Sequence, residues 1–113
     1  MLPLKNRINL KREQVFQKRK REFFSSFLFN FLLLEEKENF PPQFAIIVSK
    51  KIEKKASKRN RIKRILAAVI RGFLPEIKKG IRGVFLAKKE ILEKDFWTIK
   101  REVELFLKSK GWL

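Results

Sequence analysis

Residues 57–73 read SKRNRIKRILAAVIRGF, and this stretch decides the fold. At about 100° per residue, apolar side chains recur at the i, i+3, i+4 spacing of a single helical stripe. The stripe consists of Ile62, Ile65, Leu66, Val69, Ile70 and Phe73. The pattern predicts a helix over residues 57–73 that packs on a core, with Ser57 as a plausible N-cap.

The opposite side of this helix is basic. It carries Asn60, Arg61, Lys63, Arg64 and Arg71, with only the small Ala67 and Ala68 between them. Lys58, Arg59 and Arg61 stand in the first turn, at the positive end of the helix dipole, where cations are unfavourable. Because a phosphate near the helix start would relieve this conflict, we expect this face to dock a nucleic acid.

Composition supports a folded, basic protein. The chain has 113 residues and a formal charge of +17, from 29 Lys and Arg against 12 Asp and Glu, so the expected partner is a polyanion. Apolar residues make up 44%, including twelve Phe and two Trp, which is enough to form a core and excludes a disordered basic tail. The length predicts one domain over residues 1–113, and its charge predicts that this domain binds a polyanion.

Several function classes are disfavoured. The chain has no Cys and no His, which removes disulfides, thiolate chemistry and the commonest general base. It lacks a glycine-rich phosphate loop and a convincing carboxylate cluster for metal. Residues 1–11 contain no apolar signal segment, and the apolar runs are too short to span a membrane, so we expect a cytoplasmic protein.

Residues 12–21, REQVFQKRKR, predict a short helix with Val15 and Phe16 as its main apolar side chains. Phe16 has two interpretations of similar weight. It stacks on a nucleic-acid base at the edge of a groove, or it anchors a surface helix to the core.

Residues 23–34, FFSSFLFNFLLL, predict one strand because they are aromatic-rich and lack Gly and Pro. Alternation places Phe27, Phe29, Phe31 and Leu33 on one face and Leu28, Asn30, Leu32 and Leu34 on the other. An aromatic row can stack on bases, but exposed it would promote aggregation, so the core interpretation is favoured. The Asn30 face is then the better candidate for an open cleft.

The polar residues 35–42 predict a hairpin connection to a second strand over residues 43–51. Phe44, Ile46 and Val48 share one face of that strand, while the smaller face of Ala45, Ile47 and Ser49 matches the Asn30 face. Residues 50–58 form a basic connection to the central helix, with Ile52 as a possible short edge strand. A charge run is usually a solvated loop, but this run continues into the basic helix face, which favours a shared anionic partner.

The remaining elements complete an α+β sandwich. Residues 83–88 predict a buried strand of the same sheet, and residues 95–107 predict a final helix with Asp95 as N-cap and Gly111 as the end of the structure. The expected order is helix, two or three strands, helix, strand, helix.

Two stretches carry a resemblance to a known family. They are F-A-I-I-V-S-K-K at 44–51 and K-R-N-R-I-K-R-I-L at 58–66, supported by V-F at 15–16 and F-L-A-K-K at 85–89. In this order and spacing they closely resemble the signature of the bacterial ribonuclease P protein component. The resemblance extends over essentially the whole chain and implies a ribosomal protein S5 domain 2-like fold.

The resemblance implies the non-catalytic subunit of a tRNA-processing endoribonuclease. Ribonuclease P RNA would cleave the 5′ leader from precursor tRNA with magnesium, while the protein alone binds no cofactor, no small-molecule substrate and no membrane. By position, the residues that would contact the catalytic RNA are Arg59, Asn60, Arg61, Lys63, Arg64 and Arg71. Those that would line the leader cleft are Phe16, Asn30, Ser49, Lys50, Lys51 and Lys88. Arg12 and Asn30 stand where the family commonly has aromatic residues, which predicts weaker leader stacking.

Two other functions compete with this interpretation. A small ribosomal protein or RNA chaperone shares the charge, size and fold class. A protein-only nuclease would need clustered carboxylates for metal, and their absence from the sequence counts against it.

Overall fold

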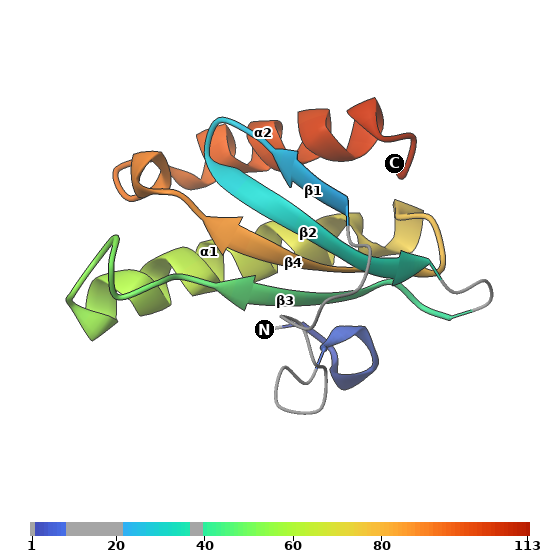
Figure 1. Cartoon of the computed structure of the whole chain (residues 1–113), viewed down its shortest axis with the longest axis horizontal. Helices are drawn as coiled ribbons and strands as arrows, with labels where there is room; N and C mark the ends of the chain where they lie inside the picture. Colours follow the sequence, from blue (N-terminus) through green and yellow to red (C-terminus); the bar gives the residue numbers. More distant parts are fainter. Residues whose placement is uncertain (1, 9–21, 37–39) are drawn as a thin grey trace.

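The computed structural model describes residues 2–8, 22–36 and 40–113 (Figure 1). Its elements in chain order are η1 (Leu4–Asn6), β1 (Glu22–Ser25), β2 (Phe29–Glu36), β3 (Gln43–Ile47), α1 (Ala56–Phe73), η2 (Leu74–Glu76), β4 (Ile81–Ala87), η3 (Lys89–Ile91) and α2 (Phe96–Ser109). The strands form one four-stranded sheet in the order β1-β2-β4-β3. The α+β class is confirmed, whereas the helix predicted over residues 12–21 lies outside the described residues.

β4 is a central strand that lies between β2 and β3, which corrects the hairpin predicted between residues 23–34 and residues 43–51. β4 pairs antiparallel with β2 and parallel with β3, so β2 and β3 are not neighbours. Residues 81–85 of β4 are buried in succession, as expected for a strand covered on both faces. Gly83 allows close approach to β2, because a Cβ at this position would overlap the Phe31 ring and lie 2.8 Å from the Leu32 carbonyl oxygen.

The single strand predicted over residues 23–34 is wrong, because the chain turns at residues 26–28. Ser26 N donates to Phe29 O at 2.8 Å to close a hairpin between β1 and β2. Phe27 lies in this turn and is 63% exposed, so it leaves the predicted phenylalanine row. Phe29, Phe31 and Leu33 are buried as predicted.

The helix α1 matches its prediction to within one residue. Ile62, Leu66, Val69, Ile70 and Phe73 are buried, and Ile65 is partly buried against the same core. Two details differ from the prediction. Lys55 is the N-cap and makes no side-chain cap hydrogen bond, so Ser57 lies inside the first turn. Ala67 is buried beside the stripe.

The C-terminal part follows the predicted helix and then continues. Asp95 caps α2 by accepting a hydrogen bond of 2.9 Å from Thr98 N. Gly111 adopts a positive φ of 74°, which favours glycine, and turns the chain back. Trp112 is buried and contacts Phe31, so the ordered structure continues beyond Gly111. Ile52 lies in a turn and forms no edge strand.

The main core lies between the sheet and both helices, which cover the same face (Figure 1). Its aromatic members contact one another and comprise Phe29, Phe31, Phe44, Phe85, Phe106 and Trp112. A smaller cluster on the other face contains Ile8, Leu34, Ala45 and Val84. In the described residues, neither helix is long and apolar enough to cross a membrane.

Candidate nucleic-acid interface

Two arginines of α1 hold neighbouring backbone. Arg59 donates to the carbonyl oxygens of Glu53 and Lys54 at 2.9 and 2.7 Å. Arg61 donates to the carbonyl oxygens of Leu92 and Lys94 at 3.5 and 3.4 Å. These side chains therefore fix the start of α1 to the preceding connection and to the loop before α2, in addition to contributing positive charge.

The other flank of α1 is free to bind. Asn60, Lys63 and Arg64 are exposed, and their side chains make no hydrogen bond or ion pair with any residue that the structure describes. They line a cavity of about 530 Å³ between α1, β3 and the N-terminal segment. Arg71 lies farther along the same face and lines a second hollow with Lys5 and Lys79. The predicted basic face thus exists as a row of cations along α1.

A second candidate surface is the face of the sheet opposite the helices, which we call the open face because neither α1 nor α2 covers it, although Ile8 of the N-terminal segment packs on its Ala45 and Val84. Its residues are set by register: Ser25 pairs with Asn30, Asn30 with Leu86, and Leu86 with Ile47. Paired residues point to the same side of a sheet, and alternation extends this side to Lys88 and Ser49 beyond the strand ends. Asn30, Ser49 and Lys88 therefore meet at one end of the sheet.

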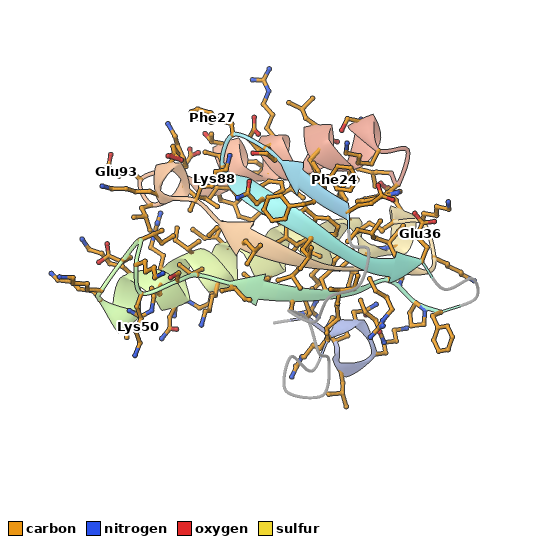
Figure 2. All side chains as sticks on the ribbon, viewed as in Figure 1. Phe24, Phe27, Glu36, Lys50, Lys88 and Glu93 are labelled. Carbon is orange, nitrogen blue, oxygen red and sulfur yellow. The ribbon has the colours of Figure 1, made fainter. Side chains whose placement is uncertain are left out.

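Figure 2 shows Lys50 and Lys88 at this end of the molecule, away from Glu36 at the other. Lys50 and Lys51 are exposed in the turn after β3. Ser49 stabilises that turn, since its Oγ accepts a hydrogen bond of 3.0 Å from Lys51 N. Lys88 is half-buried and donates to Ser25 Oγ at 2.8 Å and to Ser26 O at 2.5 Å. Five of the six predicted cleft residues gather here, and Phe16 lies outside the described residues.

Asn30 carries an unmet hydrogen-bonding capacity. Its Oδ1 atom is buried and accepts no hydrogen bond in the described part of the chain. A buried acceptor without a donor is costly, because desolvation is not repaid by a bond. Asn30 therefore places a buried acceptor without a donor on this face of the sheet, in the part of the chain that the structure describes.

The alternation pattern missed one aromatic residue of the open face. Phe23 pairs with Leu32, which pairs with Val84, so the three side chains form a row across the sheet. Phe23 is 58% exposed, while Phe24 points to the core and contacts Phe106 and Trp112. The Ser-Ser pair at 25–26 was the available sequence signal for the β1–β2 turn. This turn places Phe23 on the open face, whereas alternation along a single strand would place it with Phe29 and Phe31.

Acidic residues are also present at the end of the sheet that holds the cleft candidates, since Figure 2 shows Glu93 at the same end of the molecule as Lys50 and Lys88. Ion pairs in the described residues include Lys78 with Glu36 at 3.9 Å and Lys108 with Glu104 at 3.5 Å, and neither pair involves Asn60, Lys63 or Arg64. The described residues contain no group of three or more His, Cys, Asp or Glu that could hold a metal ion. The geometry fits binding to an anionic polymer on two faces.

Comparison with known proteins identifies the family. A family model described as Ribonuclease P matches residues 4–111. The chain belongs to the ribonuclease P protein family. It is 33% identical over 114 residues to the ribonuclease P protein component of Rippkaea orientalis, covering 96% of this chain and 90% of that one. It is 43% identical over 67 residues to the counterpart from Microcystis aeruginosa, covering 59% of this chain. That match spans 56% of the Microcystis protein, and a match to a Synechococcus relative spans 54%, so the chain spans about half the length of these relatives.

Solved ribonuclease P proteins share the fold. The Thermotoga maritima protein superposes with a TM-score of 0.77 at 25% identity, covering 89% of this chain and 96% of that one. The Staphylococcus aureus protein gives a TM-score of 0.76 at 22% identity, covering 95% and 96%. The mixed sheet with two helices is thus the fold of ribonuclease P proteins.

Proposed function

We propose that this chain is the protein subunit of a bacterial ribonuclease P, whose RNA performs the cleavage that matures the 5′ end of tRNA. The family match over residues 4–111 carries this proposal. In it, the protein binds two RNAs: the catalytic ribonuclease P RNA and the 5′ leader of precursor tRNA. Such a subunit acts in the cytoplasm, where precursor tRNA is processed.

The basic face of α1 binds the catalytic RNA. Asn60, Lys63 and Arg64 carry no competing partner in the described part of the chain, and Arg71 extends the row. Lysine and arginine on phosphates release counterions, which gives affinity that falls with salt and little sequence discrimination. Arg59 and Arg61 contribute charge while their hydrogen bonds orient the helix.

The open face binds the single-stranded leader. Lys88, with Lys50 and Lys51 at the same end of the sheet, supplies positive charge, and Asn30 lies on the same face as a polar side chain. Single strands bind through stacking and backbone contact. Phe16 belongs to this site in the proposal.

Two RNA-binding surfaces on one protein explain how a subunit without a catalytic side chain promotes cleavage. Once α1 is bound to the catalytic RNA, the open face is held near the cleavage site, so leader binding becomes effectively intramolecular. Substrate affinity rises without a new catalytic group. We place the magnesium ions of the reaction on the RNA and its substrate, and assign no catalytic side chain.

Reconstitution tests the proposal. Purified protein, free of RNA, is mixed with a bacterial ribonuclease P RNA and a precursor tRNA at low magnesium, and leader release is measured. We expect cleavage well above that of the RNA alone, and none from the protein alone. Lack of stimulation would favour a ribosomal protein or an RNA chaperone, and cleavage by the protein alone would favour a nuclease.

A further inference from the structure

The cavity beside α1 has an apolar interior and a basic rim. Its volume is about 530 Å³, within the range of about 300–1,000 Å³ typical of small-ligand sites. The apolar lining comprises Leu2, Ile8, Phe44, Ala45, Ile46 and Ala67. The polar lining comprises Arg7, Asn60, Lys63 and Arg64. We call this cavity the α1–β3 pocket.

The walls of the pocket are held in place by hydrogen bonds. Ile8 N donates to Phe44 O at 3.1 Å, which joins the N-terminal segment to the edge of β3. Arg7 Nε donates to Leu2 O at 2.6 Å, and Asn6 Nδ2 donates to Pro42 O at 2.7 Å. A ligand therefore meets a pre-formed cavity and does not have to order its walls.

The lining defines the chemistry of the occupant. The apolar interior favours a flat, uncharged group. Lys63 and Arg64 at the rim favour an anionic group attached to it. An unpaired nucleotide has both parts, since its base can leave the stack while its phosphates stay at the surface. The formal charge of +17 favours a nucleic acid over an acidic small molecule that would fill the cavity alone.

We propose that the α1–β3 pocket receives one unpaired base of the ribonuclease P RNA, with the flanking phosphates on Lys63 and Arg64. The inference rests on the proposed function. It adds a base-binding site to a helix face that otherwise contacts only the sugar-phosphate backbone of the RNA. Asn60 lies at the rim, where its carboxamide can both donate to and accept from a base edge. Burial of the base contributes affinity that does not depend on counterion release, so this contact resists salt.

The test fills the pocket without changing charge. Ala67→Leu adds apolar volume to the lining of the pocket, while Ser109→Leu places a leucine at an exposed position of α2, outside the pocket and outside the basic face of α1. Affinity for a ribonuclease P RNA is measured across a salt series. We expect about tenfold weaker binding for Ala67→Leu with an unchanged salt slope, and wild-type binding for Ser109→Leu.

Base-specific chemical probing of the RNA gives a second readout. The wild-type protein should shield one unpaired base from modifying reagents, and Ala67→Leu should restore its reactivity. Equal affinity and an equal footprint for wild type and Ala67→Leu would overturn the inference while leaving the proposed function intact. If wild type does not bind the RNA at all, the proposed function itself fails.

Folding is checked by circular dichroism and thermal melting. Should Ala67→Leu fail to fold, photochemical crosslinking of the wild-type complex decides the matter instead. Crosslinks from a single unpaired nucleotide to Phe44, Ile46 or Ala67 would support the inference. Crosslinks confined to Lys63, Arg64 and Arg71 would overturn it, because they describe backbone contact alone.

Discussion

Lys88 Nζ donates a hydrogen bond of 2.8 Å to Ser25 Oγ, and this contact joins the end of β4 to the end of β1 across the start of β2. Asn30 of β2 is the register partner of Ser25. The ammonium group is therefore fixed at the Ser25 end of the Ser25–Asn30 pair, at one end of the open face. One side chain both closes this end of the sheet and supplies its charge.

Replacing Lys88 should weaken leader binding more than it weakens binding of the protein to the ribonuclease P RNA. Lys88→Met keeps much of the aliphatic stem but removes the charge and the bonds to Ser25 and Ser26. We expect a loss of about 0.5–1.5 kcal/mol in stability per lost hydrogen bond and weaker binding of leader-bearing precursor tRNA by the assembled complex. Denaturant melts and substrate titrations measure the two effects. Unchanged leader affinity would remove Lys88 from the site.

Arg64 and Arg61 form a matched pair on one helix. Arg64→Ala removes a cation without a partner in the described residues, so affinity for ribonuclease P RNA should fall and the slope of log K against log salt should shrink by about 0.7–0.9. Arg61→Ala should also lower the melting temperature, because its bonds to the Leu92 and Lys94 carbonyls are lost. Equal effects of both variants on melting would contradict this division.

Gly83 and Gly72 should respond oppositely to alanine. A Cβ at Gly83 would overlap the Phe31 ring, so Gly83→Ala should destabilise by about 1–3 kcal/mol or more. At Gly72 in α1 a Cβ meets nothing within 4 Å, so Gly72→Ala should stabilise by up to about 1 kcal/mol. Urea unfolding of the two variants compares them directly, and a well-tolerated Gly83→Ala would argue against the β2–β4 register.

The stripe of α1 is tested by Leu66→Ala. Leu66 is fully buried, so the substitution should cost about 2–5 kcal/mol. Leu105→Ala in α2 is the control, since Leu105 is exposed and should lose little. A small loss at Leu66 would mean that this face of α1 does not pack on the sheet.

Asp95 gives a pH-dependent contribution to stability. Hydrogen bonds from the Thr98 side chain and backbone lower the pKa of Asp95 below its ordinary value of 3.8. A lowered pKa in the folded state stabilises the fold above pH 3.8, and this contribution disappears as the pH falls through the folded-state pKa. The melting temperature of Asp95→Ala should therefore lie below that of wild type near neutral pH, and the gap should narrow in acid. A gap independent of pH would contradict the charged cap.

Local patterns predicted the helices well. The stripe of α1 and the Asp95 cap depend on residues within a few positions of one another, so spacing alone finds them. The turn at residues 26–28 carries no Gly or Pro, and the aromatic run hides it. The position of β4 between β2 and β3 depends on pairing between distant segments, which periodicity does not encode.

The residues of the candidate site also fall into those that local spacing predicts and those that depend on contacts between distant segments. Asn60, Lys63 and Arg64 follow from the helical wheel, and the structure leaves them free to bind. The bonds of Arg61 reach residues more than thirty positions away, so no local pattern could assign them. Phe23 could not be placed on the open face before the β1–β2 turn was known.

The central claim is that α1 and the open face bind different RNAs. The most direct measurement compares the affinity of the ribonuclease P RNA for precursor tRNA and for mature tRNA without a leader, each with and without this protein. We expect the protein to raise the affinity for the leader-bearing substrate and to leave the affinity for mature tRNA nearly unchanged. An equal increase for both, or none for either, would contradict it.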